Sequence, residues 1–353
     1  MKRRELILGL VALLALAGLF AYEQHLHPFN WRVFAGEFEK ANWTKIALGA
    51  SCIYIAFVFR GVRWAWLLRP NKRVALFSLI GTQVIGFTAV ALIGRIADLV
   101  RPYLVSKRTS LPLGSQLAVY VVERLFDAGS MALLFCTAIL LSPSGSLPHQ
   151  ELFNEIGKGG LALTAAGVLF LFAVRLWGEQ MALLLGGMVR PFSPRFSQAV
   201  VQKIRAFHGG LDTLRTPLDF VITLSISLAM WCLITTAYWE GTGAFTGSSP
   251  ALSRCLALMA GGGVASIIQL PVIGWFTQIA ALQEMLKPLF GMSPETAMAC
   301  ATTLLLITFL GIAPVGLIWA HFEHLSLRKV TLESEQAGGK FAATEAAGEG
   351  SAS

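Results

Sequence analysis

Residues 74–108 read VALFSLIGTQVIGFTAVALIGRIADLVRPYLVSKR. The first part, 74–94, is an apolar run that contains three glycines, and it passes directly into a segment with Arg95, Asp98 and Arg101. An apolar run of about 20 residues is long enough to cross a bilayer as a helix. We therefore expect a membrane protein whose charged groups lie close to the hydrocarbon.

The composition of the whole chain agrees with a membrane protein. Of its 353 residues, 55% are hydrophobic and 14% are charged, and the mean hydropathy is +0.64. Soluble domains carry about 25% charged residues, so this sequence cannot build a fully water-facing surface. The net charge of +8 favours loops that contact anionic lipid head groups over nucleic-acid binding. Apolar segments at about 6–22, 45–68, 74–94, 116–141, 160–177, 218–239, 252–280 and 296–320 predict an all-α transmembrane helix bundle of about six to eight spans.

The last part of the chain has a different composition. Residues 331–353 are mainly Gly, Ala, Glu and Ser, with one aromatic residue. Such a segment cannot bury a core. We expect a transmembrane domain over 1–330 and a disordered C-terminal tail over 331–353.

Lys and Arg residues concentrate in three regions, 60–73 (which begins with Arg60 and Arg63), 95–110 and 175–215. Cytoplasmic loops carry an excess of these residues, but simple crossing by every apolar segment places the last two regions outside. These regions all fall on the cytoplasmic side if 74–94 enters the membrane and returns on the same side. Part of 252–280 is expected to do the same. We therefore expect two broken or re-entrant segments in a multi-pass protein of the cell (plasma) membrane with a cytoplasmic N-terminus.

Glycine and proline residues support the same interpretation. The segment 252–280 contains a run of three glycines at 261–263, followed by Pro271 and Gly274. Irregular backbone at membrane depth persists only where protein or a water-filled cavity satisfies its polar groups. One interrupted segment in each half of a chain points to a transporter-type site between inverted repeats, whereas glycines that only permit close helix packing are the alternative.

The first cluster of charges follows the apolar run 74–94. On a helix, Asp98 lies one turn from both Arg95 and Arg101, so we expect it to contact both. The cluster keeps a net positive charge, which suits an anion such as a lipid phosphate, because arginine binds such groups with two hydrogen bonds.

The second cluster, Glu123, Arg124 and Asp127, lies near the start of the long apolar segment 116–141. A charge at mid-bilayer costs about 2.5–3.5 kcal/mol on insertion scales, so these groups must face one another, the first cluster or water. We expect Glu123 or Asp127 to pair with Arg95 or Arg101. The clusters form either a functional site or ion pairs that only fix helix packing.

The charged motifs resemble one known family. GFTAVALIGRIADLVRPYLVSKR at 86–108 and SLPLGSQLAVYVVERLFDAGSMALL at 110–134 are similar to the lysylphosphatidylglycerol synthase transmembrane-region family of flippase-like membrane proteins. The matching positions are Gly94, Arg95, Asp98, Arg101, Leu104, Glu123, Arg124 and Asp127, and more weakly Pro271, Gly274, Glu284 and Gly291. The resemblance spans about 40–325, and Asp98 stands where the family often has Glu.

The synthases of this family carry a large soluble domain after the membrane part, whereas only the short tail 331–353 follows it in this sequence. The resemblance therefore implies lipid translocation rather than lipid synthesis. The implied partner is a membrane lipid, either an anionic phospholipid or a polyprenyl-phosphate lipid. An accessory role in envelope-lipid or polyprenyl-linked glycan synthesis, without transport, is the alternative, with a homo-oligomer or a synthesis enzyme as further possible partners. The expected head-group site comprises Arg95, Asp98, Arg101, Glu123, Arg124 and Asp127, with Gln269, Pro271, Gly274 and Glu284 as secondary candidates.

An enzymatic function is not expected. The sequence contains no phosphate-binding loop, no nucleophile-elbow motif and no zinc-protease motif. We therefore expect no catalytic residues, no cofactor and no metal, although a membrane-embedded transferase stays open as a third hypothesis.

Overall fold

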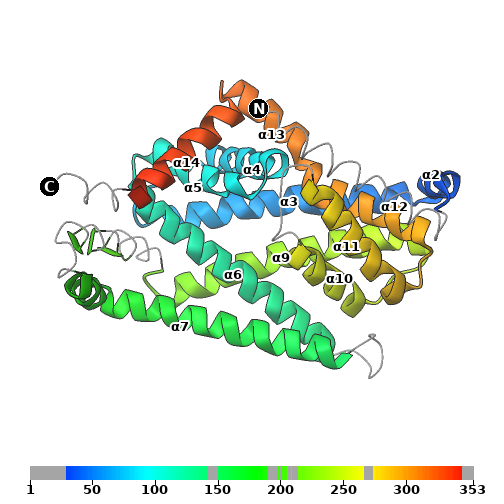
Figure 1. Ribbon diagram of the computed structural model, residues 1–353, viewed down its shortest axis with the longest axis horizontal. Coiled ribbons are helices and arrows are strands. Elements are labelled where there is room, and N and C mark those ends of the chain that lie inside the picture. The colour runs from blue at the N-terminus through cyan, green and yellow to red at the C-terminus, as the bar shows by residue number, and fades with distance from the viewer. Residues whose placement is uncertain are drawn as a thin grey trace, which may run out of the picture.

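The computed structural model describes residues 29–140, 150–189, 197–198, 201–202, 204–205, 208, 214–265 and 273–343. Within these ranges the chain forms helices and no strand (Figure 1), which confirms the predicted all-α class. The helices are α2 Trp31–Lys40, α3 Trp43–Leu68, α4 Leu76–Ile93, α5 Val100–Thr109, α6 Leu113–Leu140, α7 Gln150–Val189, α9 Pro217–Thr246, α10 Leu252–Ala265, α11 Ile273–Phe290, α12 Pro294–Leu305, α13 Ile312–Phe322 and α14 Leu327–Ala343, with a 3-10 helix η1 Arg95–Leu99 and a π-helix η2 Leu306–Leu310.

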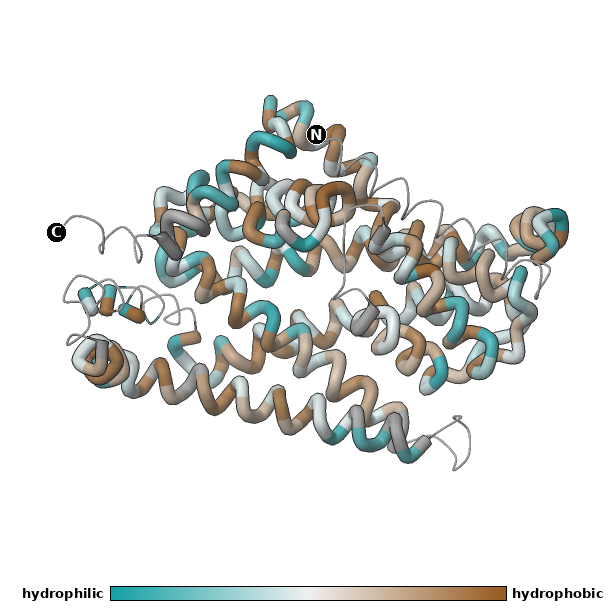
Figure 2. The backbone as a smooth tube through the Cα atoms, viewed as in Figure 1, coloured by the Kyte–Doolittle hydropathy of each residue, from teal (hydrophilic) through white to brown (hydrophobic). Residues whose placement is uncertain are grey.

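Four helical segments in the described part of the chain are long and apolar enough to cross a bilayer: α3, α4, α9 and the continuous segment Pro294–Phe322. Large apolar side chains such as Leu163 and Phe322 are exposed on the outside of the bundle. Figure 2 shows hydrophobic residues along most of the helices. This surface suits contact with lipid, and the predicted membrane helix bundle is confirmed. The first apolar segment, 6–22, lies outside the described residues.

Helices α4 and α5 form a helical hairpin. Gly94 ends α4 with φ 96° and ψ −171°, a backbone conformation that is essentially restricted to glycine. Helix α5 then runs back along α4. The evidence is a hydrogen bond of 2.6 Å, which Arg108 at the end of α5 donates to the carbonyl of Ser78 near the start of α4. The apolar run 74–94 is thus broken at its end, and the returning arm is the segment expected to be a charged loop.

Helices α10 and α11 form a second hairpin. A Cβ atom on Gly262 would lie 3.1 Å from Leu282, so the two arms pack closely. Arg254 at the start of α10 and Phe290 at the end of α11 line one shared pocket, which shows that the arms are antiparallel. In Figure 1 this hairpin lies to the right of the first hairpin.

The charge count treats Arg60 and Arg63 as loop charges, whereas for Arg101 the sequence leaves both a loop and a buried position open. In the structure α3 continues to Leu68 and buries Arg60 and Arg63, and α5 buries Arg101. Burial is tolerated because carboxylates on α6 face these cations.

The C-terminal segment differs from the expected tail. Residues Leu327–Ala343 form α14, which extends the helical domain beyond residue 330, while 344–353 lie outside the described residues. Leu327 and Val330 pack in the apolar cluster that contains Leu104, and this contact anchors the helix. Glu333 of α14 accepts hydrogen bonds from Tyr103 at 2.9 Å and Lys107 at 3.2 Å.

Candidate functional site

Arg63 on α3 binds both carboxylates of α6. Its Nη2 donates to Glu123 Oε1 at 2.8 Å, and its Nη1 donates to Asp127 Oδ1 at 2.6 Å. The same Nη1 also donates to the hydroxyl of Ser227 on α9 at 2.8 Å. Arg63 is fully buried, so a single side chain links three helices inside the bundle. Removing one partner of such a pair leaves an uncompensated buried charge.

Glu123 also binds the first hairpin. Its Oε1 accepts a hydrogen bond from Arg101 Nη1 at 3.2 Å, and its Oε2 accepts one from Trp64 Nε1 at 2.9 Å. The guanidinium of Arg101 lies 4.4 Å from the ring centre of Phe87, a cation–π contact. The contact of Glu123 with Arg101, which the sequence predicts as one of four possible pairs, is therefore present.

The first charge cluster forms the predicted contacts. Asp98 Oδ2 lies 3.2 Å from Arg95 Nη1, and Asp98 Oδ1 lies 3.7 Å from Arg101 Nη2. Arg95 and Asp98 belong to η1, at the point where the first hairpin turns. The ion pair of Arg95 and Asp98 therefore lies at this turn, where both residues line a central cavity.

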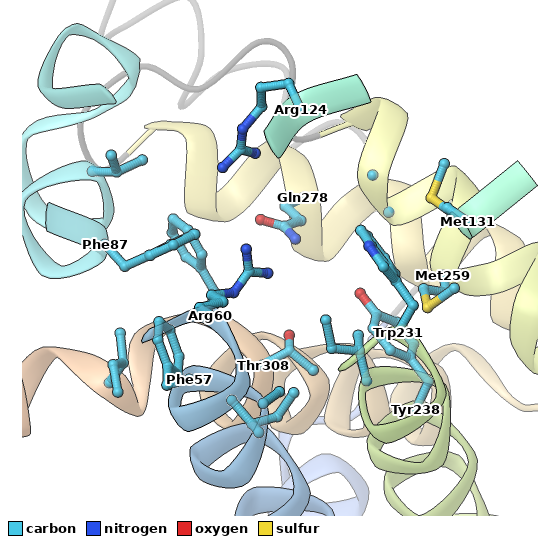
Figure 3. A pocket seen from close by; sticks show the side chains of 18 of the residues that line it. Phe57, Arg60, Phe87, Arg124, Met131, Trp231, Tyr238, Met259, Gln278 and Thr308 are labelled. Carbon is cyan, nitrogen blue, oxygen red and sulfur yellow. The ribbon is translucent and has the colours of Figure 1, made fainter. Parts of the chain in front are cut away.

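This central cavity has a volume of about 190 Å³ and is lined by residues of both hairpins and of α3, α6, α9, η2 and α13. Figure 3 shows Arg60, Arg124 and Gln278 pointing into the same space, with Phe57, Phe87, Trp231 and Tyr238 around it. Pockets that enclose a drug-sized ligand are larger, about 300–1,000 Å³. The central cavity therefore has room for a head group and not for a whole lipid. Its polar lining residues include Arg60, Arg95, Asp98, Arg124, Gln278 and Thr308.

Several polar atoms at this cavity have no hydrogen-bond partner among the described residues. They include Arg60 Nη1, Arg124 Nη2 and the side-chain oxygen of Gln278. Arg60 Nη1 lies 3.8 Å from Glu123 and 3.7 Å from Asp127, which is too far for a hydrogen bond. Unsatisfied buried donors are costly. Arginine donors without partners on a cavity wall are suited to bind an anion.

The predicted site residues divide into two groups. Arg95, Asp98 and Arg124 line the central cavity, whereas Arg101, Glu123 and Asp127 lie behind its wall. The structure therefore brings all six residues into one connected set of ion pairs, but only three of them face the cavity.

The secondary candidates are more scattered. Gly274 is buried in α11 and is not among the residues that line the central cavity. Glu284 is exposed and forms a 2.6 Å ion pair with Lys287, so it does not join the site. Gln269 and Pro271 lie outside the described residues.

The most important residues missing from the predicted site are Arg60 and Arg63. Both occur inside the apolar stretch 45–68, in FVFRGVRWAW, and this position could have marked them as intramembrane charges. Trp231 was also missed; it lines the cavity and donates to Asp127 at 3.3 Å. Its only sequence signal is its place in an apolar helix, which is not specific.

The family to which these residues belong can be identified from the sequence. The family described as lysylphosphatidylglycerol synthase TM region matches residues 6–316. No curated protein and no solved structure matches the chain. The matched range contains both hairpins, all six residues of the charged motifs and the whole lining of the central cavity. The chain therefore belongs to the lysylphosphatidylglycerol synthase transmembrane-region family.

Proposed function

We propose that this protein is a flippase-like lipid translocase, which holds the phosphate of a membrane lipid in the central cavity as the lipid moves between leaflets. The observation that carries the proposal is the pair of arginines, Arg60 and Arg124, which both line this cavity and both have a buried nitrogen without a hydrogen-bond partner among the described residues. Intramembrane ionisable residues that face a cavity typically mark a substrate pathway. Membership in the family supports lipid handling in a membrane.

The charged residues have two different tasks in this proposal. Arg60 and Arg124 contact the phosphate, and Arg95 is held beside them by Asp98. Arg63 and Arg101 neutralise Glu123 and Asp127 behind the wall. Arg101, expected from the sequence to contact the lipid, becomes a positioning residue.

The two hairpins explain how a head group could reach the cavity. Arg95 lies at the turn of the first hairpin, and Gly262 and Gln278 come from the second. Broken helices that meet at a central site are typical of transporters that work by alternating access. Because the sequence contains no nucleotide-binding motif, we propose that lipid movement is passive or driven by an ion gradient.

The test is lipid scrambling in vesicles reconstituted with the full-length protein. Acyl-labelled anionic phospholipid in the outer leaflet is bleached by dithionite, and the protected fraction reports movement. We expect wild-type protein to accelerate movement, and Arg60→Gln and Arg124→Gln to reduce it about tenfold or more, as for loss of a charge-assisted hydrogen bond.

Arg205→Gln is the matched control, because Arg205 forms an exposed ion pair with Glu179 away from the cavity. Equal movement by wild type and both cavity variants would show that the assigned site is wrong. Lipid binding without any movement would reject translocation and favour the accessory role.

A further inference from the structure

The charges of the central cavity do not balance. Among the described residues that line it, the charged side chains are those of Arg60, Arg95, Arg124 and Asp98, a net charge of +2. The excess is carried by Arg60 and Arg124, because Arg95 is paired with Asp98 at 3.2 Å.

The residues behind the wall do not remove this excess. There the two arginines, Arg63 and Arg101, meet two carboxylates, those of Glu123 and Asp127, at distances of 2.6–3.2 Å. This inner layer is neutral by itself. Arg60 and Arg124 form longer ion pairs with the same two carboxylates, at 3.7–3.9 Å. Four arginines therefore share two carboxylates, and a net charge of +2 remains on the side of the cavity.

An uncompensated charge in a buried site is strongly unfavourable, so the ligand that best neutralises the excess should bind best. A phosphate monoester carries a charge of about −1.5 to −2 near neutral pH, and two arginines favour the doubly charged form. A phosphodiester carries a single negative charge and leaves one arginine uncompensated. A zwitterionic head group adds an ammonium and leaves the excess unchanged.

The size of the central cavity points in the same direction. Its volume of about 190 Å³ is small. In a lipid phosphate monoester the phosphate is the end of the head group, so no further head-group atoms need space in the cavity. An aminoacylated glycerol head group would bring extra bulk together with an ammonium. Among the described lining residues, the only carboxylate available for an ammonium is that of Asp98, which already binds Arg95.

We infer that the preferred ligand of the central cavity is a lipid phosphate monoester, a head group with two negative charges, in preference to phosphodiester, zwitterionic or aminoacylated lipids. The inference rests on the proposed lipid-binding function of this cavity. Phosphatidic acid and a polyprenyl phosphate share the required chemistry, and they differ only in their chains.

The experiment is a displacement assay with the full-length protein in phosphatidylcholine nanodiscs. The probe is phosphatidic acid labelled on its acyl chain. The competitors are unlabelled phosphatidic acid, a polyprenyl phosphate, phosphatidylglycerol and phosphatidylethanolamine. We expect at least one monoester to displace the probe at concentrations about tenfold (~1.4 kcal/mol) below those needed for phosphatidylglycerol. The monoester that competes better identifies the preferred chain.

A pH series gives a second readout. The second proton of a phosphate monoester leaves near pH 6, so monoester affinity should rise as the pH rises through this value, while phosphatidylglycerol affinity stays constant. The titratable and charged protein groups around the site are Arg60 and Arg63 of α3, Arg95 and Asp98 of η1, Arg101 of α5, Glu123, Arg124 and Asp127 of α6, and Tyr238 of α9. The described lining contains no histidine, the side chain that ordinarily changes its charge between pH 5 and 8, so a change near pH 6 reports the phosphate.

Arg124→Gln removes one of the two excess charges. In this variant the preference for monoester over phosphatidylglycerol should fall toward one, whereas Arg124→Lys should restore it and Arg205→Gln should not change it. The side chain of Arg124 is about one-third exposed, so these substitutions should leave the folded bundle intact.

The outcomes separate this inference from the proposed function. If phosphatidylglycerol displaces the probe as well as the monoesters do, and Arg60→Gln abolishes binding of both, the cavity binds lipid and the charge-based preference is wrong. If Arg60→Gln and Arg124→Gln bind the probe as wild type does, the proposed site itself is wrong.

Discussion

Arg101 Nη1 lies 3.2 Å from Glu123 Oε1, and both side chains are buried behind the wall of the central cavity. This pair joins the returning arm of the first hairpin to α6. Stability and ligand binding are therefore assigned to different members of one charged cluster, and the two can be measured separately.

Glu123→Gln should destabilise the protein by about 3–5 kcal/mol, because it leaves Arg63 and Arg101 without their shared buried carboxylate. The measurement is thermal unfolding in detergent, followed by size-exclusion chromatography with tryptophan fluorescence. Glu284→Gln is the control, since Glu284 is exposed. Equal unfolding temperatures for Glu123→Gln and wild type would contradict the assignment.

Arg60→Gln and Arg101→Gln should have opposite profiles. Arg101→Gln removes hydrogen bonds to Glu123 and should lower the unfolding temperature. Arg60 Nη1 makes no hydrogen bond to a described residue, so Arg60→Gln should change the unfolding temperature little and weaken lipid binding instead. Thermal unfolding and the nanodisc displacement assay, run on the same preparations, check this. A variant that loses both properties together would argue against the division.

Gly86→Ala should disturb the first hairpin. A Cβ atom on Gly86 would overlap Cγ of Arg101, so the arms of the hairpin must separate or Arg101 must leave Glu123. Overpacking of this kind costs about 1–3 kcal/mol, which thermal unfolding detects. Gly187→Ala is the matched control, because a Cβ atom on Gly187 meets nothing within 4 Å. Similar unfolding temperatures for the two variants would count against the close packing of α4 and α5.

Docking of α14 should depend on pH. Hydrogen bonds from Tyr103 and Lys107 lower the pKa of Glu333 below its ordinary value of 4.5. A lowered carboxyl pKa contributes stability that is present above the ordinary value and is lost as the pH falls through the lowered one. Hydrogen exchange of α14 should be faster in Glu333→Gln than in wild type at neutral pH, and equal well below pH 4.5. Equal protection at neutral pH would exclude a role for Glu333.

The place where the first apolar segment ends could be predicted from the sequence because its cause is local: Gly94 permits a backbone conformation that other residues avoid. The returning arm α5 could not be predicted, because its charged residues resemble those of a loop. The position of Arg60 and Arg63 inside the apolar stretch 45–68 could have marked them as intramembrane charges, but their partners could not be predicted from the sequence. Their position depends on contacts with Glu123 and Asp127, which are 60 or more residues away.

The helix α14 was missed for a related reason. Its composition is polar, with two glycines and two glutamates, and such segments are usually disordered when isolated. The helix persists because Val330 is buried against the first hairpin and Glu333 binds Tyr103. Tertiary contacts of this kind leave no periodic signal in a short polar segment.

The ion pairs of Arg63 have a consequence for biosynthesis. Glu123 and Asp127 follow Arg63 by 60 and 64 residues, so a nascent α3 emerges before either partner has been synthesised. Insertion of α3 alone would carry about 2.5–3.5 kcal/mol for each unpaired arginine placed near the bilayer centre. We therefore expect α3 to wait at the insertion machinery or the membrane interface until α6 arrives, so that α3, the first hairpin and α6 enter the bilayer as one cooperative unit.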